Sequence, residues 1–177
     1  MSNIRQLSRR DFLKTGGVLV LGISMVGCGR EPTPIATRPV SSEPWSPDVF
    51  ISFDADGTVD IISHRSEMGQ GIRTGLPAVL ADEMEADWGR VKVVQAAGDA
   101  KYGNQNTDGS WSVRGFMQRM REAGATVRLM LEQSAANQWG VDPAECTAEF
   151  HTVVHKPSGR VLDFADLVAG AAELPVP

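Results

Sequence analysis

Residues 67–74 read Glu-Met-Gly-Gln-Gly-Ile-Arg-Thr and join a strand-like run to a helix-like one. Glycine has no Cβ, so the backbone at this junction can adopt a positive φ and approach a ligand closely. The first amides of the following helix have no intrahelical partner and favour an anion. Gln70 can both donate and accept hydrogen bonds. The stretch therefore indicates either a tight strand-to-helix turn or a binding site for a phosphorylated ligand with polar edges.

A β-hairpin is predicted immediately before this junction. Residues 49–53 and 58–63 are rich in Val, Ile and Phe, and the Asp-Ala-Asp-Gly cluster at 54–57 separates them. Such a cluster between two apolar runs is typical of a hairpin turn. His64 follows the second strand, and no partner for a metal or catalytic role is recognisable, so we interpret it as a turn residue.

A helix is predicted after the junction. Apolar residues recur at helical spacing from Ile72 to Met84, with acidic residues mostly on the other side. Pro77 lacks a backbone donor and should kink or restart the helix, and Gly89 should end it. Because no His or Cys joins the acidic residues, we interpret them as a solvated face rather than a metal site.

The rest of the chain predicts a small α+β domain over residues 48–177. We expect one mainly antiparallel sheet packed with two or three helices. The remaining elements are a strand at 90–97, a polar loop at 98–109, a long helix at 113–139, a hairpin at 146–162 and a helix at 164–173 capped by Asp163.

A second loop-to-helix corner lies at Ser110 and Ser112. It follows the loop at 98–109, and loops of this length are uncommon in a compact domain unless they have a function. Hydroxyls and free amides at a helix N-terminus suit phosphate or pterin oxygens, although ordinary N-capping is an alternative role for either serine. If the two corners converge in space, their spare amides can hold one ligand.

Five segments carry a family resemblance. They are residues 64–75 (His-Arg-Ser-Glu-Met-Gly-Gln-Gly-Ile-Arg-Thr-Gly), 86–88 (Ala-Asp-Trp), 98–101 (Gly-Asp-Ala-Lys), 109–114 (Gly-Ser-Trp-Ser-Val-Arg) and 121–125 (Arg-Glu-Ala-Gly-Ala). Together they resemble the xanthine dehydrogenase/aldehyde oxidase family of molybdopterin enzymes, and in particular the large (beta) subunit of the isoquinoline 1-oxidoreductase type. The large subunits of that family are several times longer than this chain, so we expect it to correspond to their N-terminal part.

The resemblance implies a cofactor and partners. It implies a molybdopterin cytosine dinucleotide held in part by a set of five residues, namely Gly69, Gln70, Gly71, Ser110 and Ser112. It also implies a small 2Fe–2S subunit that takes the electrons, and the remainder of the large subunit. The family chemistry is hydroxylation of an N-heterocycle or aldehyde carbon.

The catalytic base of the family is expected elsewhere. Family members take this glutamate from a later part of their chain, and Glu67 belongs to the cofactor motif instead. We therefore expect this chain alone to bind a cofactor weakly and to catalyse nothing. Two alternatives are a split enzyme completed by a second chain, and a non-catalytic periplasmic or lipid-anchored binding or scaffold protein that keeps an inherited fold.

The N-terminus predicts export. Residues 8–14 read Ser-Arg-Arg-Asp-Phe-Leu-Lys, a twin-arginine signal, and the apolar run at 16–27 is too short to span a membrane. We expect a signal over residues 1–28, with Cys28 either lipidated in a lipoprotein box or incidental. A proline-rich linker is expected over residues 29–47. The predicted location is the periplasm, with a membrane anchor only through Cys28.

Composition excludes two other classes. The net charge is −5 and the estimated pI about 5.2, so the chain lacks the basic surface of a nucleic-acid-binding protein. The chain contains 2 cysteines, too few to ligate an iron–sulfur cluster. Cys146 has no second cysteine beyond the predicted signal, so we interpret it as a small buried hydrophobe.

Overall fold

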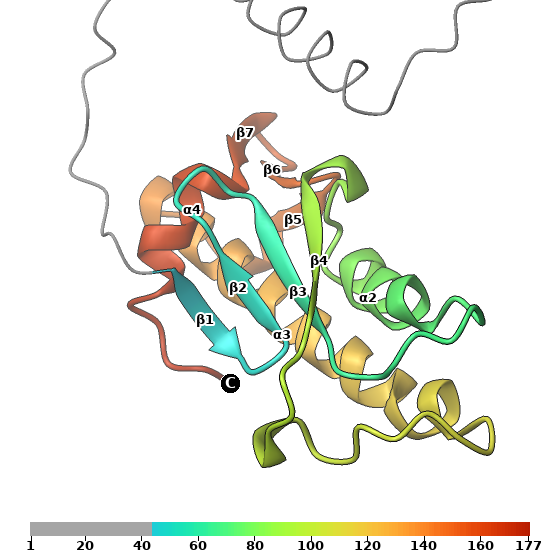
Figure 1. The fold of residues 1–177 in the computed structure, drawn as a ribbon. Coiled ribbons are helices and arrows are strands. Elements are labelled where there is room, and N and C mark those ends of the chain that lie inside the picture. Colours follow the sequence, from blue (N-terminus) through green and yellow to red (C-terminus); the bar gives the residue numbers. More distant parts are fainter. Residues whose placement is uncertain (1–43) are drawn as a thin grey trace, which may run out of the picture. The chain divides into compact units, whose positions relative to one another are not determined.

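The computed structural model describes residues 44–177 and has an α+β fold built from two mostly antiparallel sheets (Figure 1). The predicted fold class is confirmed, with two sheets in place of the one expected. The predicted signal at 1–28 and most of the predicted linker at 29–47 lie outside the described residues. The last residues assigned to that linker are described and differ from the prediction, because Trp45–Asp48 forms strand β1.

The first sheet has four strands in the order β1-β2-β3-β4. Strands β2 (Ile51–Phe53) and β3 (Val59–Ser63) form the predicted antiparallel hairpin, in which Ile51 pairs with Ile61. The alternate side chains of these two strands are buried, as a sheet with one face on the core requires. Strand β4 (Val91–Gln95) pairs with β3 in parallel, because helix α2 carries the chain back to the same end of the sheet.

Helix α2 spans Ile72–Glu83 and begins after Gly71, whose φ of 82° is left-handed. The helix continues through Pro77 as one element, so it does not restart there, and the alternative of a kink stays a prediction. It also ends before Gly89, which lies in a short 3-10 helix (Trp88–Arg90). The physical reason is at Glu85, whose φ of 61° is left-handed. The next amide, of Ala86, donates to the carbonyl of Ala81 at 2.9 Å, which closes the helix as a glycine ordinarily would.

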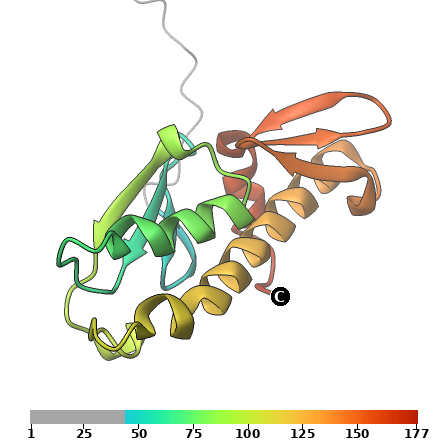
Figure 2. The same ribbon diagram turned by 90° about the vertical axis from the view of Figure 1, so that its right-hand side faces the viewer.

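Helix α3 (Trp111–Trp139) is the longest element and contacts both halves of the domain. Its first half lies beside α2, and its second half lies beside the second sheet and helix α4 (Phe164–Ala171) (Figure 2). Gly140 ends α3 with a left-handed φ of 66°, as predicted. No helix within residues 44–177, α3 included, combines the length and apolar character needed to cross a membrane.

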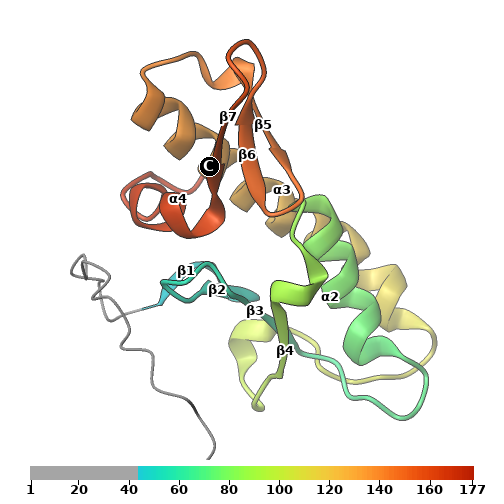
Figure 3. The same ribbon diagram turned by 90° about the horizontal axis from the view of Figure 1, so that it is seen from above.

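The second sheet is a three-stranded antiparallel group in the order β5-β6-β7. Its strands are β5 (Cys146–Glu149), β6 (Thr152–His155) and β7 (Arg160–Asp163). Viewed from above, these strands form a group separate from β1–β4 (Figure 3). Cys146 is buried at 5 % exposure, in agreement with its interpretation as a small hydrophobe.

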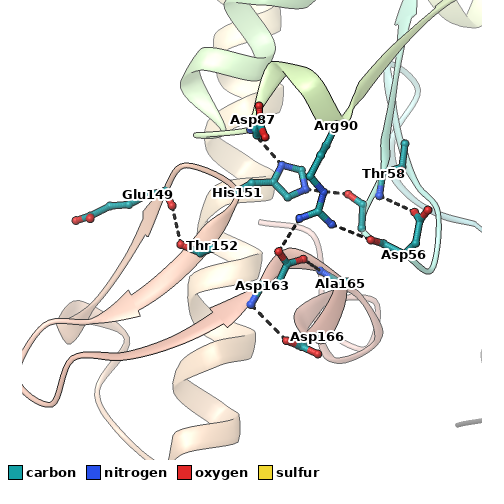
Figure 4. A network of polar contacts seen from close by, with 11 residues as sticks. Asp56, Thr58, Asp87, Arg90, Glu149, His151, Thr152, Asp163, Ala165 and Asp166 are labelled. Carbon is teal, nitrogen blue, oxygen red and sulfur yellow. Dashed lines mark hydrogen bonds and ion pairs between the residues drawn. The ribbon is translucent and has the colours of Figure 1, made fainter. Parts of the chain in front are cut away.

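A polar network joins the first sheet to the second (Figure 4). Arg90 forms a 2.6 Å ion pair with Asp163 and donates to the carbonyl of Asp56 at 2.8 Å. The Nδ1 atom of His151 accepts the amide hydrogen of Asp87 at 3.1 Å, so Nε2 carries the ring hydrogen and donates to the carbonyl of Gly57 at 2.9 Å. Burial lowers the pKa of His151 and favours this neutral ring.

Gly124 sets the distance between α2 and α3. A Cβ atom there would lie 2.6 Å from the carbonyl oxygen of Leu80 and 3.0 Å from the Cβ of Glu83. Both obstacles belong to α2, and a backbone carbonyl cannot move without displacing the helix. The two helices therefore need glycine at this position, although it weakens the helix by about 1 kcal/mol relative to alanine.

The substitution Gly124→Ala should lower the free energy of unfolding by about 1–2 kcal/mol, because overpacking exceeds the gain in helix propensity. Gly115→Ala in the same helix is the matched control. The three atoms nearest to its Cβ all belong to the side chain of Trp111, which is 43 % exposed and can turn away. We expect that control to be neutral or slightly stabilising in urea unfolding of the full chain. Equal effects of the two changes would contradict this account of the packing.

Candidate functional site

The two predicted corners line one pocket. Its volume is about 480 Å³. Gln70 and Gly71 line it from the first corner, and Ser110 and Ser112 line it from the second. Gly69, the fifth candidate, is not part of the lining. The remaining lining residues are Met68, Ile72, Gly75, Thr107, Asp108, Gly109 and Val113. The structure therefore brings together two segments about forty residues apart in sequence.

The pocket has open space where its glycines lie. Cβ atoms placed on Gly71, Gly75 and Gly109 would meet no atom of residues 44–177 within 4 Å. Gly71 and Gly109 also have left-handed φ values of 82° and 49°. A side chain at either position would be strained and would project into unfilled space, so the glycines leave room for a ligand.

The first corner differs from its prediction, because its amides are not spare. The carboxylate of Glu67 accepts hydrogen bonds from the amides of Gly69, Gly71 and Arg73 at 2.6, 3.0 and 2.9 Å. The amides of Arg73 and then Gly71 are the largest causes of the lowered pKa of Glu67. The carboxylate of the chain itself thus takes the position that an anion was expected to occupy at the start of α2.

Gln70 is also engaged within its own turn. Its Oε1 atom accepts the amide hydrogen of Met68 at 2.6 Å, and its Nε2 atom donates to the carbonyl of Ser66 at 3.1 Å. These bonds hold the exposed turn in a defined shape. One lone pair on Oε1 and one hydrogen on Nε2 are not used by these two bonds, and the Gln70 side chain can contact a ligand through them.

The second corner is not closed by an ordinary N-cap. Ser110 has a left-handed φ of 58°, and no side-chain cap from it reaches the α3 amides in the described part of the chain. The amide of Trp111 donates to the carbonyl of Asp108 at 2.9 Å. Ser112 is buried at 7 % exposure, and its Oγ accepts a hydrogen bond from the Nε of Arg65 at 2.9 Å.

Arg65 is a site residue that the sequence reasoning missed. It is fully buried, and its Nη1 donates to the carbonyl and side-chain oxygens of Asn104. Its guanidinium lies 5.1 Å from the ring centre of Phe116. Burial lowers the pKa of Arg65, but an arginine keeps its charge in proteins. Only the motif around residues 64–75 drew attention to this position, and nothing in it indicated burial.

His64 lies in the same buried cluster. Its ring centre is 4.9 Å from that of Phe50 and 4.3 Å from that of Phe116. Its Nε2 atom has no hydrogen-bond partner among residues 44–177. Burial, followed by the charge of Arg65, lowers the pKa of His64 from 6.5 to about 4. The residue predicted as a turn histidine is therefore a neutral core residue behind the pocket.

A metal site and a second pocket are the other places where a ligand could bind. Within residues 44–177, no group of three or more His, Cys, Asp or Glu side chains is placed to hold a metal ion. A second pocket of about 560 Å³ lies beside the C-terminal half of α3 and has a mainly apolar lining that includes Leu129, Met130 and Leu174. Glu132, which also lines it, already accepts the amide hydrogen of Ala148 at 2.9 Å. The lining of the pocket between the two corners is mainly apolar as well, and that pocket is the better candidate because Gln70, Gly71, Ser110 and Ser112 line it.

Comparison with known proteins identifies the family. The family described as "Molybdopterin cofactor-binding domain" matches residues 3–176, so the chain belongs to it. The chain is 36 % identical over 171 residues to the beta subunit of isoquinoline 1-oxidoreductase of Brevundimonas diminuta, covering 93 % of this chain and 22 % of that protein. The family resemblance inferred from the sequence is confirmed.

Two further relatives and one solved structure agree. The chain is 34 % identical to the membrane-bound aldehyde dehydrogenase (pyrroloquinoline-quinone) of Gluconacetobacter polyoxogenes, with 92 % of this chain and 21 % of that protein covered. It is 29 % identical to a nicotinate dehydrogenase subunit of Pseudomonas putida, with 96 % and 14 % covered. The crystal structure of quinoline 2-oxidoreductase from Pseudomonas putida 86 shares the fold, with a TM-score of 0.54, 21 % identity, and 71 % and 16 % covered. The chain thus spans about a fifth of the length of the first two relatives.

The buried state of His64 predicts a pH dependence of stability. The folded pKa is about 4 and the unfolded value 6.5, so the unfolded chain binds more protons between these limits. Above pH 6.5 the ring of His64 is neutral in both states and costs no stability. As the pH falls towards 4, the ring takes up a proton in the unfolded chain first, which lowers the free energy of unfolding by about 1–3 kcal/mol. His64→Phe keeps the aromatic contacts and removes the titrating group.

Urea unfolding of the full chain between pH 4 and pH 7.5 measures this effect. The variant should lose less stability than the wild type as the pH falls. Any contribution from His151, whose pKa is also lowered, is common to both proteins. The same slope in both proteins would show that folding does not shift the pKa of His64, and would contradict the prediction.

Proposed function

We propose that the pocket between the two corners holds part of a molybdopterin cofactor in its cytosine dinucleotide form. Four of the five candidates, Gln70, Gly71, Ser110 and Ser112, line the pocket and would contact the cofactor, and Gly69 would shape the turn that carries Gln70. The observation that carries this proposal is the pocket itself, which both corners line and which its glycines leave open. Membership of the molybdopterin cofactor-binding family supports it.

The residues fit such a ligand in distinct ways. Gly71 and Gly109 let the backbone approach a large planar group, because no Cβ stands in its path. The amides at the start of α3 and the hydroxyl of Ser112 supply hydrogen-bond donors for phosphate or pterin oxygens. Glu67 holds the glycine turn in shape through three amides. When bound, the cofactor would supply the redox chemistry that hydroxylates a carbon atom.

The whole protein in which this domain acts is proposed to be a large subunit of a molybdenum hydroxylase. Two relatives, from isoquinoline 1-oxidoreductase and nicotinate dehydrogenase, are themselves named as subunits, which supports a multi-subunit oxidoreductase. The proposed reaction is oxidation of an N-heterocycle or aldehyde, with electrons passed to a small 2Fe–2S subunit. We propose that the catalytic base and the substrate pocket come from the remainder of the large subunit, so that this chain alone is inactive.

The proposed location is the periplasm, reached through the twin-arginine signal at residues 1–28. Export of folded cargo suits a protein that takes up a bulky cofactor before it leaves the cytoplasm. Lipidation of Cys28 would add a membrane anchor. Intact-mass measurement of the exported protein checks this: a mature chain that begins beyond residue 28 without added lipid would exclude the anchor.

Cofactor content of the protein purified from its native host tests the proposed function. We expect molybdenum by elemental measurement and a fluorescent oxidised pterin in comparable amounts. Gly71→Val should reduce both by about tenfold, because the side chain would strain a left-handed residue and enter the pocket. Gly159→Val is the matched control, because Gly159 has a left-handed φ of 67° and lies in the β6–β7 turn.

The other outcomes of the cofactor measurement are also decisive. Absence of both molybdenum and pterin would favour the non-catalytic binding or scaffold protein. Recovery of pyrroloquinoline quinone instead would assign the cofactor that appears in the name of one relative. Equal losses in the two variants would show that folding, rather than the pocket, controls the cofactor content.

A further inference from the structure

One hydroxyl on the wall of the pocket has its hydrogen-bonding role set by a buried cation. The Nε of Arg65 is a donor and has no lone pair to accept with, so the Oγ of Ser112 must accept in their 2.9 Å bond. The hydroxyl hydrogen of Ser112 is then left to donate elsewhere. No acceptor for it is found in the part of the chain that the structure describes. Because Ser112 lines the pocket, a ligand oxygen can take this hydrogen.

Two more unsatisfied polar groups lie in the same place. Thr107 also lines the pocket, and its Oγ1, enclosed just behind that lining, has no partner among residues 44–177. The Nη2 of Arg65 is buried and equally unpaired within that range. Nη2 shares an edge of the planar guanidinium with Nε, so the unpaired group is on the side that faces Ser112. Unpaired buried polar groups are costly and ordinarily mark a missing ligand or water.

The opposite corner has the reverse character. The carboxylate of Glu67 already takes the amides of Gly69, Gly71 and Arg73 and carries a negative charge. An anion at that corner would have to displace this carboxylate and would be repelled by it until it did so. Neutral groups with polar edges are not repelled by the Glu67 carboxylate.

Asp108 is the one feature of the second corner that opposes an anion. It lines the pocket, but it is exposed, so water screens its charge better than that of the buried Arg65. The attraction between Asp108 and Arg65 supports the charged state of the arginine. Asp108 therefore weakens anion binding here without abolishing it.

We propose that the pocket is polarised, with the phosphate oxygens of its ligand at Ser112 and Thr107 and the neutral heterocyclic part at the Gln70 turn. Arg65 is the positioning residue in this arrangement, because it makes Ser112 a donor towards the ligand. The inference rests on the proposed function for the identity of the ligand. The assignment of the anionic end rests on the contacts of Arg65, Ser112 and Glu67.

Titration of the ¹⁵N-labelled full chain with inorganic pyrophosphate, followed by amide NMR shifts, tests the polarity. We expect the shifts at residues 107–114 and not at 69–73. Ser112→Ala should weaken pyrophosphate binding about tenfold, since it removes a hydrogen bond to a charged group. Ser134→Ala is the matched control in the same helix, because the Ser134 hydroxyl donates to the carbonyl of Leu167 at 3.0 Å. It should leave pyrophosphate binding unchanged.

Two carboxylate variants separate the corners further. Asp108→Asn should tighten pyrophosphate binding severalfold, because it removes the negative charge that lines the anionic end. Glu67→Gln should leave the affinity for pyrophosphate within about twofold of the wild type. A large gain in Glu67→Gln, with shifts moving to residues 69–73, would place the anion at the other corner and overturn the proposal.

The role of Arg65 is tested by a ratio of affinities, which a merely structural role would not change. The affinity for pyrophosphate is compared with that for the neutral nucleoside cytidine. Arg65→Met should lower this ratio about tenfold, and Arg65→Lys, which keeps a cationic donor, should restore most of it. If Arg65→Met does not fold, the ratios in Ser112→Ala and Arg65→Lys decide the question.

The remaining outcomes distinguish this inference from the proposed function. Pyrophosphate binding at residues 107–114 in a protein that carries no molybdenum or pterin would sustain the polarity and remove the cofactor assignment. The opposite result is a protein that carries molybdenum and pterin but shows pyrophosphate shifts elsewhere, or whose Ser112→Ala variant binds pyrophosphate normally. It would sustain the cofactor assignment and overturn the polarity. Absence of any pyrophosphate shift up to about 10 mM would overturn the polarity.

Discussion

The close contact between α2 and α3 at Gly124 is the constraint on which the site depends. The residues of α2 that meet Gly124 lie about ten residues from the start of that helix, and Gly124 lies thirteen residues after Trp111. The two helices run in roughly the same direction (Figure 2), so a crossing at such similar distances from their first residues leaves both N-termini at the same end, because each residue advances a helix by about 1.5 Å. The pocket is the space left between those two ends.

The two ends of the pocket differ in the charge that lies at the start of each helix. Each helix begins with backbone amides that need an acceptor. At α2 the chain supplies the acceptor itself through Glu67. At α3 no side-chain cap is formed within residues 44–177, and the buried Arg65 stands behind Ser112. One pocket therefore presents a satisfied, acidic wall and an unsatisfied wall backed by a cation.

Much of this could be predicted from local sequence. The β2–β3 hairpin, the end of α3 at Gly140 and the corner at Gly71 follow from turn chemistry and helical periodicity, which act over a few residues. The end of α2 was misplaced because Glu85 adopts a left-handed conformation that glycine usually supplies. Arg65 and the Arg90–Asp163 pair were missed because their partners lie 47 and 73 residues away.

The sequence by itself determined the family, the α+β class and the two corners, since short motifs and apolar periodicity encode them. Only the tertiary structure decided three things. The two corners share one pocket, the Glu67 carboxylate accepts hydrogen bonds from amides at the start of α2, and Ser112 accepts one from a buried arginine. The physical reason is that hydrogen bonds form between groups within about 3 Å of each other, whatever their separation along the chain. Packing of α2 against α3 sets those distances, and residue type alone does not.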